Sequence, residues 1–169
     1  MNPACSNRTG LTTITLLLTA ATALSAQDLG TRTAIDAAAP QTAWQTSEGV
    51  TVEAADGRVT LRCAGSDYGS ARPAGEAPLT QETVLVIDLD ALDGRVVRVQ
   101  AQWQDADGKF IEATRVAELD APTDAPLRPD LTQQMPAGVE AAHVGMKVWV
   151  IDDGTEATFT ALRIEQPRR

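Results

Sequence analysis

The most constraining feature of this sequence is an alternation of apolar and polar residues within positions 95–104, which is regular from Val97 to Gln104. One parity is apolar and consists of Val97, Val99, Ala101 and Trp103. The other parity is polar and consists of Arg98, Gln100, Gln102 and Gln104. Such alternation puts the two sets on opposite faces of a β-strand. We therefore expect a strand with one face in a core and the other facing water or lining a groove, because amides and guanidinium groups at this density do not belong in a core.

The segments around this strand repeat the same pattern between turn residues. Alternating or densely apolar runs predict further strands at 50–54, 59–63, 84–89, 110–119, 144–151 and 156–165. Asp-Gly pairs at 56–57, 93–94, 107–108 and 153–154 indicate tight turns. Segments rich in Gly or Pro predict two long loops, at 65–82 and 120–136. No window has a helical stripe with capping signals, so we expect an all-β fold, an antiparallel β-sandwich or barrel, over residues 43–166.

The N-terminus has the organisation of a secretory signal peptide over residues 1–26. Arg8 precedes an apolar stretch at 11–24, and small residues then lead into a polar segment. The alternative is a membrane anchor, but the stretch is short for a membrane span and has no cluster of basic residues beside it. We expect an exported protein, periplasmic or extracellular, with no membrane span in the mature chain. Residues 27–42 lack periodicity and are expected to form a flexible lead-in.

Composition excludes several classes of protein. A chain of 169 residues accommodates one domain. With 14 basic and 23 acidic residues, the net charge of −9 argues against nucleic-acid binding and would also repel an acidic polysaccharide. One histidine and two cysteines leave few ligands for zinc or iron–sulfur sites. Cys5 falls within the predicted signal peptide, and Cys63 shares the apolar parity of its strand, so we expect Cys63 to be buried.

Three segments resemble a known family. Trp44 precedes Gly-Val-Thr-Val at 49–52, residues 97–111 read Val-Arg-Val-Gln-Ala-Gln-Trp-Gln-Asp-Ala-Asp-Gly-Lys-Phe-Ile, and Pro-Ala-Gly-Val at 136–139 leads into Met-Lys-Val-Trp-Val at 146–150. Together they resemble the galactose-binding-like jelly-roll β-sandwiches found among bacterial carbohydrate-binding modules. The resemblance implies a jelly-roll sandwich that binds a carbohydrate and holds in many cases a structural calcium. Family members usually accompany a catalytic domain, and we expect none in this sequence.

Sugar binding requires an aromatic face and planar polar groups. The row formed by Arg98, Gln100 and Gln102 supplies a guanidinium and amides at strand spacing. Trp149 or Tyr68 could supply the aromatic face. The alternatives are that the polar row is an ordinary solvated face and that Trp149 belongs to the core, as we expect for Trp44 and Trp103.

Catalytic signals are weak, so we expect no enzyme activity. No Gly-x-Ser-x-Gly motif is present, and the single histidine, His143, is expected at the surface. Asp105 and Asp107 begin like a calcium loop, but Lys109 and Val116 occupy positions where an EF-hand needs oxygen ligands. We expect no cofactor beyond the structural calcium that the resemblance allows, and its ligands are unknown.

Two functional hypotheses follow. The first is a secreted, non-catalytic β-sandwich module that binds a carbohydrate. The second is a structural or protein-interaction domain of the cell envelope or matrix, with another envelope or secreted protein as its partner. An exposed aromatic side chain beside Arg98 and Gln100 would favour the first, and an extensive exposed apolar patch would favour the second.

Overall fold

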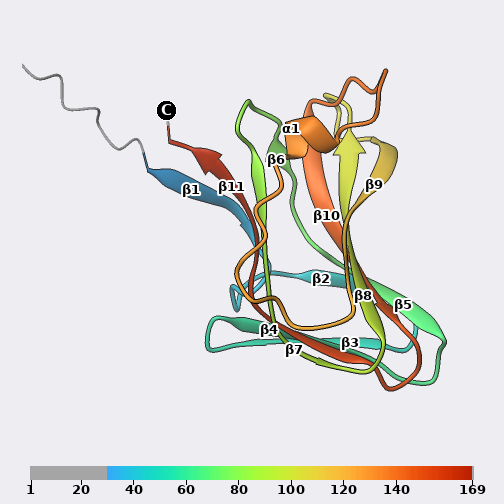
Figure 1. Cartoon of the computed structure of the whole chain (residues 1–169). Helices are drawn as coiled ribbons and strands as arrows, with labels where there is room; N and C mark the ends of the chain where they lie inside the picture. The colour runs from blue at the N-terminus through green and yellow to red at the C-terminus, as the bar shows by residue number, and fades with distance from the viewer. Residues whose placement is uncertain (1–29, 169) are drawn as a thin grey trace, which may run out of the picture.

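The computed structural model describes residues 30–168, which form two antiparallel sheets packed as a β-sandwich (Figure 1). In chain order the elements are β1 (Thr31–Asp36), β2 (Trp44–Thr46), β3 (Val50–Ala55), β4 (Arg58–Cys63), β5 (Tyr68–Pro73), β6 (Ala77–Pro78), β7 (Val84–Asp93), β8 (Val96–Gln104), β9 (Phe110–Leu119), α1 (Leu131–Gln134), β10 (His143–Ile151) and β11 (Glu156–Pro167). The expected all-β antiparallel sandwich is confirmed. The predicted signal peptide, residues 1–26, lies outside the described residues.

The long strand β11 organises the five-stranded sheet. It pairs with β7 along most of its length, and on its other side with β4 near its beginning and with β1 near its end. Strand β3 completes this sheet beside β4. The six-stranded sheet has the order β2-β5-β10-β8-β9, and β6 pairs with the beginning of β10. Strand β10 therefore lies at the centre of this second sheet, with β8 beside its whole length.

The core lies between the two sheets and confirms the predicted faces of β8. The four residues of the predicted apolar parity, Val97, Val99, Ala101 and Trp103, are buried, and Trp103 is 0% exposed. The indole Nε1 of Trp103 donates a 2.9 Å hydrogen bond to Oγ1 of Thr114, so the buried N–H is satisfied. Cys63 is buried as expected. Trp44 is half-buried and packs against the core from its edge.

The predicted hairpin at 56–57 is confirmed, and its backbone explains the residue types. Asp56 and Gly57 connect β3 to β4 with φ values of 51° and 73°. A two-residue turn with positive φ at both positions matches the twist of the strands that it joins, and Asp-Gly tolerates this conformation better than most pairs.

The expectation of a flexible lead-in at 27–42 is wrong for part of that segment. Residues Thr31–Asp36 form β1, which pairs with the end of β11, and Figure 1 shows these two ends of the chain side by side. Only Ile35 of this strand is buried, so the sequence has no apolar alternation to show it. The strand forms because the end of β11, which is distant in the sequence, pairs with it through backbone hydrogen bonds.

The expectation of one long loop at 65–82 is also wrong. This segment contains β5 and β6, which pair with β10 in the six-stranded sheet. Position 69 of β5 requires glycine because a Cβ there would lie 2.1 Å from Cγ2 of Val50. Glycine inside a strand often marks such a close approach. In the sequence alone, the same glycine resembles a turn signal.

The second predicted loop, 120–136, remains irregular apart from one helical turn. Asp130 caps α1 by accepting a hydrogen bond from the backbone N–H of Thr132. Before the helix, Leu127 and Asp130 form isolated bridges to β7, so the loop follows the free edge of that strand. Within residues 30–168, no helix has the length and hydrophobicity that crossing a membrane would require.

Candidate functional site

The face of the six-stranded sheet that points away from the core carries the predicted polar row. In the register of β8 and β10, Arg98 lies opposite Trp149, and Gln100 lies opposite Lys147. The pairing between these strands runs from one end of β10 to the other without a bulge, so both strands keep their parity. Trp149 is therefore on the outer face, and the alternative of a core position for Trp149 is wrong.

An open depression of about 380 Å³ lies on this face. Three strands contribute to it: β8 supplies Arg98 and Gln100, β10 supplies Trp149, and β5 supplies Tyr68. Four of the five residues predicted from the sequence thus meet at one place. Asp67 and Ile151 also line the depression and were not predicted, although Ile151 shares the parity of Trp149.

Two aromatic rings form a corner at this depression. Tyr68 is 61% exposed, and its ring centroid lies 6.0 Å from that of Trp149 with the ring planes 45° apart. Trp149 is half-buried and is held by its neighbours. Its Nε1 donates a 2.8 Å hydrogen bond to Oε1 of Gln100, and Nζ of Lys147 lies 4.3 Å from its ring centroid. The depression therefore combines a fixed indole with a freely exposed phenol.

A carboxylate on β9 orients Arg98. Nε of Arg98 donates a 2.5 Å hydrogen bond to Oε2 of Glu118, and Nη1 of Arg115 donates a 2.7 Å hydrogen bond to the same oxygen. The hydrogen bond from Arg98, assisted by the charge of Arg115, lowers the pKa of Glu118. Glu118 therefore remains ionised in weak acid and keeps the guanidinium of Arg98 in place at the edge of the depression.

The expectation that the whole polar row faces water or a groove needs correction at one end. Gln102 is 7% exposed and Gln104 is 1% exposed. The connection between β5 and β6 covers this end of the sheet: a Cβ on Gly145 would lie 3.4 Å from Nε2 of Gln104 and 3.6 Å from the carbonyl oxygen of Gly75. Gln102 nevertheless lines a separate, polar depression beside the first. The β5 residues there were not predicted, because the sequence around β5 is rich in glycine and proline and resembles a loop.

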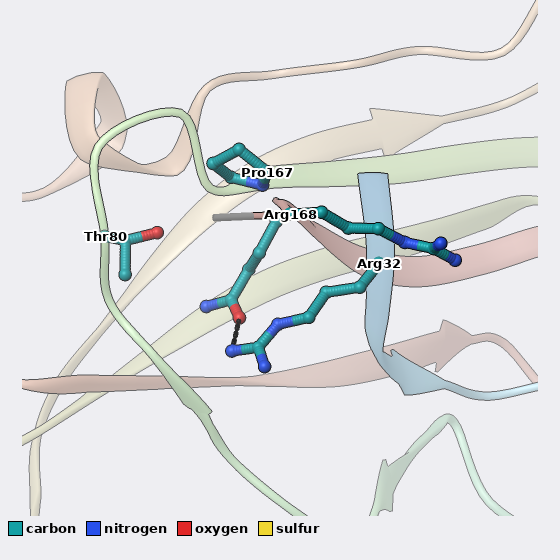
Figure 2. Close-up of a pocket in the computed structure, with 5 residues that line it drawn as sticks. Arg32, Thr80, Pro167 and Arg168 are labelled. Atoms are coloured by element: carbon teal, nitrogen blue, oxygen red, sulfur yellow. Dashed lines mark hydrogen bonds between the residues drawn. The ribbon is translucent and has the colours of Figure 1, made fainter. Parts of the chain in front are cut away.

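Another depression, of about 480 Å³, lies where β1 meets the end of β11 (Figure 2). Arg32 reaches from β1 to Gln166, to whose Oε1 it donates a 2.9 Å hydrogen bond, while Arg168 extends in another direction. Nε2 of Gln166 donates to the carbonyl oxygen of Pro78. No aromatic residue is among the described residues that line this depression. The depression at Tyr68 is therefore the better candidate for a sugar.

Residues 30–168 contain no group of three or more His, Cys, Asp and Glu side chains that could hold a metal ion. His143 is half-buried at the beginning of β10, with Nδ1 3.0 Å from the carbonyl oxygen of Asp105. The structural calcium that the resemblance allows, with unknown ligands, stays a prediction, which calcium titration followed by thermal unfolding would test.

No protein-family model and no curated protein sequence matches this chain. Among solved structures, a mutant of a family 29 carbohydrate-binding module is similar with a TM-score of 0.51, at 11% identity, over 82% of this chain and 85% of that chain. The chain has the fold of a carbohydrate-binding module. A family 29 module has a TM-score of 0.49 at 12% identity, over 82% of this chain and 88% of that chain. A family 22 module from Clostridium thermocellum has a TM-score of 0.41 at 11% identity, over 74% and 86%. The likeness at a TM-score of 0.51 confirms the predicted resemblance for the fold.

Proposed function

We propose that this protein is an exported, non-catalytic module that binds a carbohydrate in the depression between Tyr68 and Trp149. The observation that carries the proposal is an exposed aromatic ring beside polar side chains in one depression: Tyr68 is 61% exposed and shares the site with Arg98 and Gln100. Singly exposed aromatic residues are ordinary on protein surfaces, but a pair in contact beside oriented polar groups has the composition of a ligand site. The fold of the chain supports the same function.

The chemistry of the depression suits a pyranose. The C–H face of the sugar ring can stack on the phenol of Tyr68, and the indole of Trp149 can meet the edge of the ring because the two aromatic planes are tilted. Arg98 can donate to a hydroxyl with the N–H groups that its bond to Glu118 does not use. Gln100 accepts from Trp149 through Oε1, so its NH₂ group can donate to the ligand.

The open form of the site favours an internal segment of a polysaccharide over a small enclosed ligand. The depression lies on a sheet face, lined by side chains of three strands, and continues toward the polar depression at Gln102. A saccharide chain can therefore lie across the sheet and extend beyond the residues that hold it.

A glycan-binding screen followed by calorimetry on the purified protein tests this function. We expect Tyr68→Ala and Trp149→Ala each to weaken binding by about tenfold or more, because central aromatic residues carry most of the binding free energy. Phe110→Ala is the matched control, since Phe110 is a similarly exposed aromatic residue outside the depression. Far-UV circular dichroism and thermal unfolding verify that each variant folds.

Absence of binding to neutral and acidic glycans, with and without calcium, would overturn the proposal. It would favour the alternative, a structural or protein-interaction domain of the envelope or matrix. Equal losses in Phe110→Ala and Tyr68→Ala would instead show that binding does not take place at this depression.

A further inference from the structure

The outer face of the six-stranded sheet contains a second, polar depression directly beside the first. It has a volume of about 250 Å³ and is lined by Gln45, Thr46, Ser47, Ser70, Arg72, Gln102 and Lys147. Ser70 lies opposite Trp149 in the pairing of β5 and β10, and the next outward-facing residues of these strands are Arg72 and Lys147. Two same-face positions along a strand are roughly 7 Å apart, so the two depressions lie about one sugar ring from each other.

The charge of the second depression contrasts with that of the chain. Two of its seven lining residues are cationic, Arg72 and Lys147, and none is Asp or Glu. Among the ion pairs formed by residues 30–168, none includes either of these two cations. Arg98, on the same face, is by contrast neutralised by Glu118. In a protein with net charge −9, two adjacent cations without carboxylate partners form a local anion-binding surface.

Two buried polar atoms in this depression lack partners within the described part of the chain. They are Nε of Arg72, a donor, and Oε1 of Gln102, an acceptor. Gln102 is 7% exposed, and buried polar groups are nearly always hydrogen-bonded to protein, water or ligand. Chloride or sulfate can accept from Arg72, but neither has a hydrogen to donate to Gln102. A saccharide that carries an anionic group offers an acceptor for the cations and hydroxyl donors for the amide.

The acidic net charge of the chain does not prevent such binding. At about 0.1 M salt, charges more than roughly 10 Å apart are largely screened from each other, so a bound anion responds mainly to its immediate neighbours. Asp67 is the acidic residue that lines the first depression, and Arg72 lies five positions after it along mostly extended chain. That separation corresponds to roughly 16 Å. The expectation that the net charge would repel an acidic polysaccharide therefore does not apply to this end of the face.

This inference rests on the proposed function. We infer that the second depression binds the anionic group of a saccharide, a uronate carboxylate or a sulfate ester, while a neighbouring ring of the same saccharide lies on Tyr68 and Trp149. Arg72 and Lys147 hold the anion, and Gln102 accepts a hydroxyl hydrogen. The ligand class is accordingly an acidic or partly acidic polysaccharide.

Matched polysaccharide pairs test the inference by calorimetry. The first pair is polygalacturonate and its fully methyl-esterified form, which keeps the rings and removes the charge. The second pair is a sulfated galactan and its desulfated form. We expect the charged member of at least one pair to bind at least tenfold more tightly in low salt, and the pair that shows this preference identifies the anionic group. The preference should decrease in 0.5 M NaCl.

Variants locate the effect. Arg72→Gln and Lys147→Gln should each reduce the ratio of affinities for the charged and uncharged members toward one. Arg62→Gln, which removes an exposed arginine of the other sheet, should leave that ratio unchanged. Tyr68→Ala should weaken the binding of both members.

The outcomes separate the inference from the proposed function. If charged and uncharged members bind equally, the inference fails and carbohydrate binding stands. If the preference persists in Arg72→Gln and Lys147→Gln, the anion binds elsewhere and the inference also fails. If no saccharide of either pair and no glycan of the earlier screen binds, the proposed function fails and the inference fails with it.

Discussion

Nε1 of Trp149 donates a 2.8 Å hydrogen bond to Oε1 of Gln100, which belongs to the neighbouring strand. Arg98, not Gln100, is directly opposite Trp149 in the register, so the bond is diagonal and turns the indole toward Lys147. Two residues of the proposed sugar site are therefore connected before any ligand arrives. A site that is ordered in advance loses less conformational entropy when it binds.

The first prediction concerns this bond. In Gln100→Ala, the indole N–H of Trp149 should exchange with solvent faster, and saccharide affinity should decrease about three- to tenfold because both an anchor and a donor are lost. Nitrogen-15 NMR can follow the indole signals of the three tryptophans, and Trp149→Phe identifies the relevant one. Unchanged exchange in Gln100→Ala would contradict the bond.

The second prediction concerns the core. Trp103→Ala should lower the free energy of unfolding by about 3–5 kcal/mol, because it empties a fully buried site. Thr114→Val should lower the free energy of unfolding by about 1–3 kcal/mol, because it leaves the buried indole N–H of Trp103 without a hydrogen-bond acceptor. Urea denaturation measures both. Tyr68→Ala is the control for an exposed aromatic residue, and a Trp103→Ala variant as stable as this control would show that the two faces of β8 are assigned wrongly.

The third prediction concerns the glycine in β5. Gly69→Ala should destabilise the protein by about 1–3 kcal/mol, because the new methyl group overlaps the side chain of Val50. In the double variant with Val50→Ala, the loss should be smaller than the sum of the two single losses, because the smaller side chain makes room. A double-mutant cycle measured by urea denaturation gives this coupling free energy. Additive losses would indicate that the two sites do not touch.

The fourth prediction concerns acid stability. Burial alone would raise the pKa of Glu165, but hydrogen bonds from Arg163 and Arg128, of 2.7 Å and 2.6 Å, outweigh burial and lower the pKa overall. A carboxyl with a lowered folded-state pKa stabilises the fold above its unfolded pKa of about 4.3, and this stabilisation is lost as the pH falls through the folded pKa. Glu165→Gln should therefore lower the free energy of unfolding by about 1–2 kcal/mol at pH 7. The effect is limited because both arginines are partly exposed to solvent, which screens their charge.

The difference in unfolding free energy between the wild type and Glu165→Gln should then shrink below about pH 4. Urea denaturation at pH 7, 5 and 3 measures it. Glu140→Gln is the control, since Glu140 is exposed and forms no ion pair among the residues that the structure describes. A difference that stays constant across these pH values would contradict the assigned role of Glu165.

Local sequence determined the features that depend on short-range periodicity. The alternation at 95–104 was sufficient to predict β8 and the burial of Trp103, and Asp56-Gly57 was sufficient to predict the hairpin. The polar parity of β8 also identified Arg98 and Gln100 of the candidate site in advance. Each of these inferences needs only the geometry of one strand or one turn, because successive side chains alternate between faces wherever the strand lies.

Tertiary structure alone decided everything that depends on which strands pair. The sequence of β1 shows no alternation, and β5 carries a glycine that resembles a loop signal. Both segments nevertheless form strands, because β1 pairs with β11 and β5 pairs with β10, which are distant in the sequence. The burial of Gln102 and the meeting of Tyr68 with Trp149 follow from the order β5-β10-β8 and from the backbone that covers one end of the sheet. Residues far apart in the chain become neighbours through cross-strand register, which is determined by the packing of the whole sandwich and has no local signature.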